Sequence, residues 1–205
     1  HNSDERPIYA RFAAKQEQEK FVDIKKYDYM TVLTRADWNV LKDRVDETEL
    51  KKVFVMPNPL TFPPAPMVPL KEKVILAAGR LNVWHCKGFD LLLKAWAKIQ
   101  RDFPEWKLKI AGGGNAPFLK ELCSDLTIID RVEFLGFVDL KKQYEKASIF
   151  VLSSRYEGFG MVLTEAMSQG CACIACDYKG RQSEIIVDDS QGVLCPTDDE
   201  NAIAD

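Results

Sequence analysis

The chain has 205 residues, of which 46% are hydrophobic and 29% are charged, proportions typical of a globular protein. This composition excludes a disordered tail, a collagen-like fibre and a coiled coil, and no run of about 18 apolar residues predicts a membrane span. Lysine and arginine number 28 against 31 acidic residues, so the chain is no general nucleic-acid binder, although a local basic pocket for phosphate stays open. The N-terminal residues carry no apolar secretory core, which favours a cytoplasmic protein.

Six cysteines are too few to staple a chain of this length with disulfides. Three of them, Cys171, Cys173 and Cys176, cluster on a segment that is typical of a buried strand. A zinc site would need paired CxxC units or nearby histidines, and His1 and His85 lie far away in the sequence. We therefore expect reduced thiols in the core of a cytoplasmic protein and no metal site.

A proline-rich stretch at residues 56–69 holds six prolines in fourteen positions. Such a run excludes a helix or an inner strand and favours extended chain. We therefore predict a linker over 58–72, between the remnant of one domain at 1–57 and a second domain at 73–205. The first piece is too short to bury a large core alone, and the sequence TDDENAIAD at the end is typical of a helix that is starting. We expect a piece of a longer protein, cut at both ends.

Short apolar runs alternate with helical patterns, above all after the linker. There, strands are expected at 74–78, 108–111, 132–135, 149–152 and 171–175, and helices at 89–99, 118–126, 139–147 and 161–169. Before the linker, the same reasoning predicts a polar helix at 4–24, a strand at 29–33, a helix at 35–44 and a strand at 53–56. Repeated strand–helix units with continuously apolar strands indicate an α/β fold, a parallel sheet with helices on both faces.

Ligands bind at the carboxyl ends of the strands in an open parallel sheet, and cationic residues stand at one such end. Gly79 and Arg80 follow the first strand of the second domain, and Lys87 precedes the next helix. Both cations can reach an anionic group there, and glycine allows close backbone approach. The alternative is surface charge that only solubilises the loop.

A second loop joins the strand at 149–152 to the helix at 161–169. Gly158 and Gly160 let the chain turn there, so the free amides of the first helical turn point outward and form an anion site. Glu157 and Glu165 flank this site. Carboxylates repel phosphate but accept hydrogen bonds from paired hydroxyls, so the combination describes a sugar nucleotide, with its ribose, diphosphate and sugar. The alternative is that Glu165 only stabilises the helix N-terminus and Glu157 is solvated.

These residues belong to three longer groups. The groups are Gly79-Arg80-Leu81 with Lys87-Gly88-Phe89-Asp90-Leu91-Leu92, then Glu157-Gly158-Phe159-Gly160 with Glu165-Ala166-Met167 and Gly170, then Asp177, Gly180 and Glu184-Ile185. In order and spacing they resemble the C-terminal domain of retaining glycosyltransferases of family 4, over about 74–205, and the two glutamates match that family's E-x7-E motif. Residues 1–57 look like the end of the same family's N-terminal domain, which is a vaguer likeness.

The resemblance implies the GT-B architecture, in which two Rossmann-like domains face each other across a cleft. The nucleotide sugar binds mainly to the second domain and the acceptor mainly to the first. In this family, Arg80 and Lys87 would clasp the diphosphate and stabilise the charge of the leaving group, Glu157 would contact hydroxyls of the donor sugar, and Glu165 would hold the ribose hydroxyls. The remaining donor-binding positions are Gly79, Phe159, Gly160, Met161 and Val162. Side chains and helix amides then do what a cation does in other enzymes, so no metal ion or other cofactor is expected.

The implied reaction moves a sugar from a UDP-, GDP- or ADP-sugar to an acceptor hydroxyl with retention of anomeric configuration. The acceptor stays open among glycans, lipid-linked sugars and small molecules, and peripheral membrane association of the full-length protein stays open too. His1 corresponds in place to a histidine that family members often have near the sugar. Because most of the acceptor domain is missing, we expect this chain alone to bind nucleotide weakly and to transfer little or no sugar.

Other functions stay open beside this one. A nucleotide-sugar epimerase or phosphorylase shares the architecture, and a non-catalytic interaction module needs no chemistry. A dinucleotide-binding oxidoreductase domain would use Gly112-Gly113-Gly114 and an acid about 20 residues on, such as Asp130 or Glu133. The GxGxxG pattern needs a further glycine where Pro117 stands, however. A hydrolase of the GxSxG type is disfavoured because that motif does not occur in the sequence.

Overall fold

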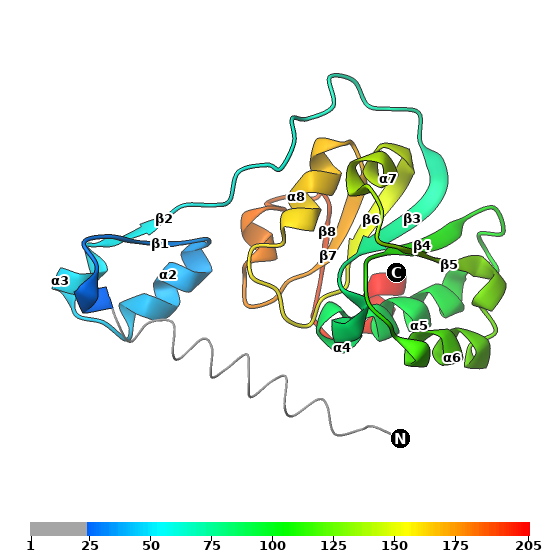
Figure 1. The fold of residues 1–205 in the computed structure, drawn as a ribbon, viewed down its shortest axis with the longest axis horizontal. Coiled ribbons are helices and arrows are strands. Elements are labelled where there is room, and N and C mark those ends of the chain that lie inside the picture. The colour runs from blue at the N-terminus through cyan, green and yellow to red at the C-terminus, as the bar shows by residue number, and fades with distance from the viewer. Residues whose placement is uncertain (1–23) are drawn as a thin grey trace.

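The computed structural model describes residues 24–205. The helix expected at 4–24 lies almost wholly outside the described residues, and His1 lies outside them altogether. Figure 1 shows two units of unequal size joined by a long extended segment. This segment spans residues 56–71 and contains no helix or strand. The described residues contain no helix that is long and apolar enough to cross a membrane.

The smaller unit is a two-stranded parallel sheet with helices on one face. Its elements are η1 (Ile24–Lys26), β1 (Met30–Val32), α2 (Arg35–Lys42), α3 (Glu47–Leu50) and β2 (Val53–Val55). Leu41 of α2 is fully buried against Val32 and Val53 of the two strands. The two strands and α2 confirm the sequence prediction for this region to within two residues, whereas the four-residue α3 is too short to leave a periodic pattern.

The larger unit contains a six-stranded sheet in which every neighbouring pair is parallel. Its strands are β3 (Glu72–Ala78), β4 (Lys107–Ala111), β5 (Val132–Gly136), β6 (Ala147–Leu152), β7 (Ala172–Cys176) and β8 (Val193–Cys195). Their order across the sheet is β5-β4-β3-β6-β7-β8. The α/β fold with a parallel sheet is therefore confirmed. The edge strand β8 escapes sequence prediction because three residues are too few for a strand pattern.

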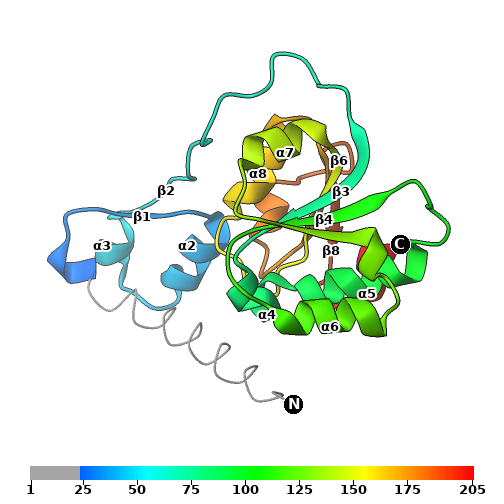
Figure 2. The same ribbon diagram turned by 45° about the vertical axis from the view of Figure 1, so that its right-hand side comes forward.

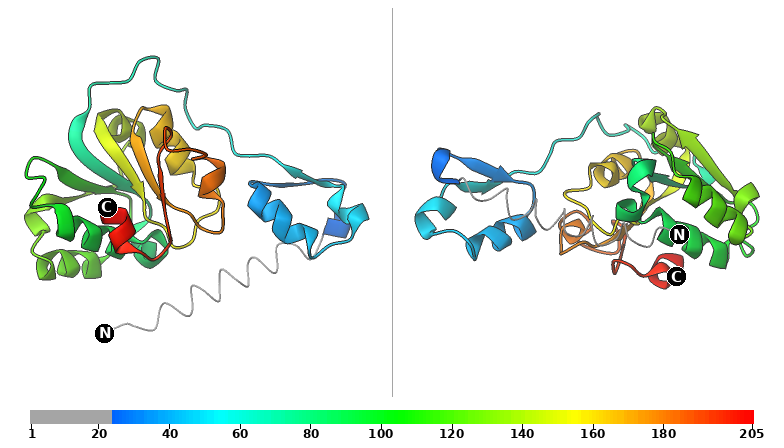
Figure 3. Two further views of the ribbon diagram at one scale, coloured as in Figure 1. Left: turned by 180° about the vertical axis from the view of Figure 1, so that it is seen from behind. Right: turned by 60° about the horizontal axis from the view of Figure 1, so that its bottom comes forward.

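Helices cover both faces of this sheet, as Figure 2 shows. They are α4 (Trp84–Lys87), α5 (Phe89–Ile99), α6 (Pro117–Asp125), α7 (Leu140–Lys146), α8 (Met161–Ser168) and α9 (Glu200–Ala204). Viewed from behind, α9 lies beside α5 on one face (Figure 3), and the two helices are in contact. Leu93 and Trp96 of α5 pack on that face. Tyr144 of α7 and Leu163 of α8 pack on the other face.

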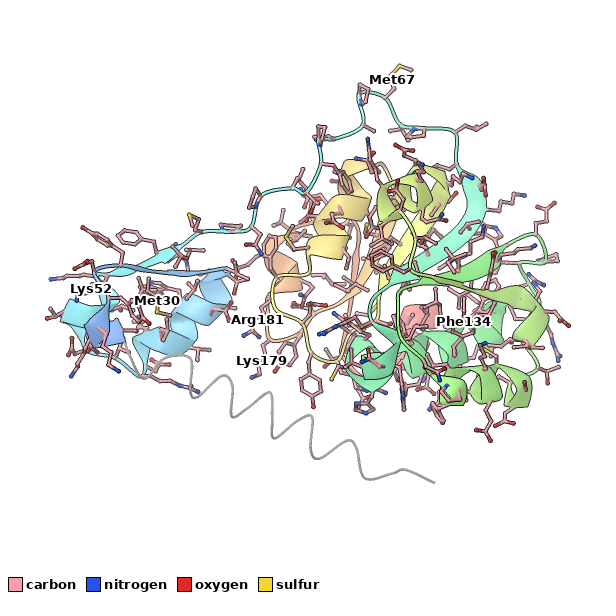
Figure 4. All side chains as sticks on the ribbon, viewed as in Figure 1. Met30, Lys52, Met67, Phe134, Lys179 and Arg181 are labelled. Atoms are coloured by element: carbon pink, nitrogen blue, oxygen red, sulfur yellow. The ribbon has the colours of Figure 1, made fainter. Side chains whose placement is uncertain are left out.

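Among the described residues, Glu184 and Arg181 of the larger unit bind the start of α2 in the smaller one. Both backbone amides at the start of α2, those of Arg35 and Ala36, donate to the carboxylate of Glu184 at 2.7 Å. The Nη2 atom of Arg181 donates to Oδ1 of Asp37 at 2.5 Å. Figure 4 shows Arg181 at the edge of the larger unit that faces the smaller one. Charges in the loop between β7 and β8 therefore hold the first turn of α2.

Candidate functional site

The strand order reverses between β3 and β6, since the strands run β5-β4-β3 on one side of this point and β6-β7-β8 on the other. At such a switch point the connections leave toward opposite faces, and a crevice opens at the carboxyl ends of both strands. Gly79 and Arg80 follow β3, and the loop at 153–160 follows β6. The two loops singled out in the sequence therefore meet at the place where this fold binds ligands.

Lys87 and Glu157 come into direct contact at this point. The Nζ atom of Lys87 donates to Oε2 of Glu157 at 2.8 Å, and the two side chains are 23% and 14% exposed. The Ser154 hydroxyl donates to the same oxygen at 3.2 Å, and the amide of Gly158 donates to Oε1 at 3.1 Å. The pair is thus a mostly buried polar centre that spans the ends of two central strands.

Gly79 and Gly88 allow the turn that carries Lys87 to pack closely against its neighbours. A Cβ atom at Gly79 would lie 3.1 Å from Cγ of Lys87, so the lysine side chain runs directly over this glycine. Gly88 has φ +63°, and a Cβ atom there would lie 1.8 Å from the carbonyl oxygen of Ser153. The Ser153 hydroxyl in turn donates to the Lys87 carbonyl at 3.0 Å. The backbone of the turn that carries Lys87 therefore packs directly against the end of β6.

The N-terminus of α8 lies beside the carboxylate of Glu157. Gly160 is the N-cap residue with φ +85°, and no side chain caps the helix. A Cβ atom at Gly160 would lie 3.5 Å from Cγ of Glu157. Because the first amides of a helix lack partners within it, those of Met161 and Val162 are available to an anion.

A hollow of about 500 Å³ lies at the end of β3. Its lining includes Gly79, Arg80, Asn82, Gly112, Gly113, Gly114, Phe137, Val138, Leu140 and Val162. Arg80 is exposed on its wall, and the side chain of Phe137 at its rim is 94% exposed. The hollow therefore connects Arg80 and Val162, two of the residues predicted to bind phosphate, to the turns after β4 and β5.

Glu165 lies farther along α8 and is only 8% exposed. Its Oε1 atom accepts a hydrogen bond from the Thr61 hydroxyl at 2.5 Å, and its Oε2 atom accepts one from the Tyr144 hydroxyl at 3.3 Å. Burial, and then the charge of Glu165, raise the pKa of Tyr144 far above its usual value. Glu165 is therefore a buried acceptor for hydroxyl groups, and Thr61 of the extended segment covers it.

The structure thus joins Gly79, Lys87, Glu157 and Gly160 in one chain of contacts, with Arg80 and Val162 in the adjoining hollow. Phe159 is 9% exposed, which makes it part of the interior. Sequence reasoning gave no individual role to three polar residues beside this centre, namely Ser154, Arg155 and Asp90. Each stands within three residues of a predicted site residue in the chain, and that adjacency was the signal available.

The glycine turn at 112–114 has a structural explanation. Gly112 has φ +150°, and a Cβ atom there would lie 1.8 Å from the carbonyl oxygen of Gly79. The following helix α6 begins at Pro117, which has no amide hydrogen to offer a phosphate. Packing against the end of β3 accounts for Gly112 without a dinucleotide.

Cysteines and other potential metal ligands are dispersed. Among residues 24–205 no group of three or more His, Cys, Asp or Glu side chains is placed to hold a metal ion. Cys171, Cys173 and Cys176 are buried free thiols, as expected of core residues. Burial raises the pKa of Cys123 to about 11 and that of Cys173 to about 12.

Comparison with known proteins decides the family. Residues 61–205 match the family described as Glycosyl transferases group 1. The chain belongs to this family. It is 31% identical over 179 residues to an uncharacterized glycosyltransferase of Haemophilus influenzae. This alignment covers 86% of this chain and 49% of the relative. The family is named for the transfer of glycosyl groups.

Two further similarities agree. An N-acetylgalactosaminyltransferase of Campylobacter jejuni, named for a diphospho-undecaprenol substrate, is 35% identical over 138 residues, covering 66% of this chain and 36% of the relative. The fold superimposes with a TM-score of 0.82 and 24% identity on a mutant of TarM from S. aureus, covering 93% of this chain and 38% of that one. The chain spans about half or less of the length of these proteins, and the likeness to TarM shows the GT-B type of fold.

Proposed function

We propose that this chain is the donor-binding half of a retaining glycosyltransferase of family 4, which takes its sugar from a nucleoside-diphosphate sugar. The observation that carries the proposal is the meeting of Lys87, Glu157 and the uncapped N-terminus of α8 at the sheet's switch point. A cation and free amides suit a diphosphate, and a carboxylate beside them suits sugar hydroxyls.

The diphosphate would lie between Arg80, Lys87 and the amides of Met161 and Val162. As the bond to the sugar breaks, negative charge grows on the leaving diphosphate, and preformed cations and amides stabilise it without a metal ion. Lys87 is already held by Glu157 at 2.8 Å, so it needs little rearrangement to meet the ligand. An acceptor hydroxyl from the other domain would then attack the sugar.

Glu165 would hold the ribose. Its two oxygens already accept hydrogen bonds from the hydroxyls of Thr61 and Tyr144, which is the chemistry that ribose hydroxyls offer. Thr61 must give way for ribose to reach the carboxylate. The base would then occupy the hollow near Gly113 and Phe137, where Arg80 is the one charged side chain among the described lining residues.

The wider assignments rest on the relatives. The Campylobacter relative is named for a diphospho-undecaprenol-linked sugar, which supports a lipid-linked or glycan acceptor. We propose in addition a cytoplasmic location and peripheral membrane association of the full-length protein. UDP, GDP and ADP sugars remain the candidate donors, with no metal or other cofactor.

Calorimetric titration of the chain with UDP, GDP, ADP and NAD tests the proposal. We expect one nucleoside diphosphate to bind, and Arg80→Ala and Glu165→Ala each to weaken it by about 1–3 kcal/mol, as for charge-assisted hydrogen bonds. Lys98→Ala, on α5 away from the switch point, is the control and should leave affinity unchanged. Preference for NAD would indicate an oxidoreductase domain, and no nucleotide binding at all would indicate an interaction module. Product analysis with a full-length protein separates a transferase from an epimerase or phosphorylase.

A further inference from the structure

Arg155 is a mostly buried cation in the loop that carries Glu157. Its side chain is 11% exposed and makes a two-pronged contact with Asp90 of α5, with Nη1–Oδ1 at 2.7 Å and Nη2–Oδ2 at 2.8 Å. Asp90 is itself 11% exposed at the side chain. A paired guanidinium and carboxylate of this geometry form a strong and directional contact.

The same residue binds the turn that carries Lys87. Its Nη1 atom also donates to the His85 carbonyl at 2.9 Å, and its backbone amide donates to the Cys86 carbonyl at 2.9 Å. Its Nε atom donates to Asp198, in the loop before α9, at 2.7 Å. Four partners from three separate segments therefore converge on one side chain and its amide.

Burial alone would lower the pKa of Arg155, but the hydrogen bonds and charge of Asp90, followed by those of Asp198, outweigh it and raise the pKa. The guanidinium therefore stays charged, and removing Asp90 would leave this mostly buried charge with only the exposed Asp198 as its counter-ion. Lysine at this place keeps the charge but cannot reproduce the planar fork.

We propose that Arg155 is a positioning residue of the donor site, which fixes the loop of Glu157 against the turn of Lys87. Lys87 and Glu157 come from these same two segments, so the distance between them depends on how firmly the segments are tied together. Arg155 lies two residues from Glu157, and its carbonyl partners lie one and two residues from Lys87. The effect on nucleotide binding rests on the proposed function, whereas the tie between the segments does not.

Two measurements test this on Arg155→Lys. The first is nucleoside-diphosphate affinity by calorimetry, which we expect to fall about tenfold. The second is the rate at which the Cys86 thiol reacts with an aromatic disulfide reagent, which we expect to rise about fivefold or more as the turn loosens. All six cysteines are among the described residues and Cys86 is the only one not buried, and Cys86→Ser confirms the origin of the signal.

Arg131→Lys is the matched control. Arg131 also binds two carbonyls, those of Phe103 and Trp106 at 3.0 and 2.7 Å, but it precedes β5 at the opposite end of the sheet. The Arg131→Lys substitution should lower the melting temperature of the chain. It should change neither the nucleoside-diphosphate affinity nor the reaction rate of Cys86. If it changes both readouts as Arg155→Lys does, general destabilisation explains the effect and the proposal is overturned.

A double variant tests whether Arg155 affects nucleotide binding through Lys87. In a Lys87→Ala background, Arg155→Lys should cost less than about twofold in further affinity, because the contact it positions is already gone. Full additivity overturns the proposal, as does an unchanged Cys86 rate. If the native chain binds no nucleoside diphosphate, the proposed function fails, and the Cys86 rates still decide whether Arg155 ties the two segments together.

Discussion

Gly88→Ala tests the backbone contact that places the lysine turn against β6. Two costs add at this position. A non-glycine residue at φ +63° costs about 1–2 kcal/mol. The new Cβ atom would also lie 1.8 Å from the Ser153 carbonyl oxygen, and overpacking of this kind costs about 1–3 kcal/mol. We therefore expect a loss of about 2–5 kcal/mol, or about 4–20 °C in melting temperature for a chain of this size.

Two other glycines separate these costs. Gly136 has φ +68° but no atom within 4 Å of a built Cβ, so Gly136→Ala should show the backbone cost alone. Gly158 has neither a positive φ nor a close neighbour, so Gly158→Ala should be within about 0.5 kcal/mol of the native chain. Urea unfolding measures all three. Equal losses for Gly88→Ala and Gly136→Ala would refute the close approach between residues 88 and 153.

Three further predictions concern the chain's pH response and its contacts. Burial raises the pKa of Cys123 from 9.0 to about 11, so the thiol ionises first in the unfolded chain. The free energy of unfolding should therefore fall by about 1.4 kcal/mol per pH unit for this thiol between about pH 9 and pH 11. The urea midpoint of Cys123→Ala should fall less steeply over the same range. Asp37→Asn removes the negative charge that pairs with the Arg181 guanidinium and should increase the radius of gyration in small-angle scattering. An unchanged radius would show that other contacts hold the units together. Gly79→Ala should displace the Lys87 side chain, whose Cγ and Cδ lie 3.1 and 3.2 Å from the new atom, and weaken nucleotide binding about threefold or more; unchanged affinity in calorimetry would argue against Lys87 as a phosphate ligand.

The regular elements of this protein were readable from local patterns. Apolar runs such as 149–152 and the helical spacing of 89–99 place β6 and α5 correctly, because each pattern records which face of a single element is buried. The short elements α3, α4 and β8 were missed, since three or four residues do not complete a period. Their places depend on neighbours that the local sequence does not name.

The candidate site, like the fold, could be predicted from the sequence only in part. The sequence by itself determined which residue types stand at the ends of β3 and β6, because motif spacing is a property of the chain. Only the tertiary structure decided that Lys87 donates to Glu157, that Arg155 joins Asp90 across 65 positions, and that Thr61 covers Glu165. Such contacts arise when the strand order brings distant loops to one edge of the sheet. No local pattern encodes that order, because it is set by how all the buried faces pack together.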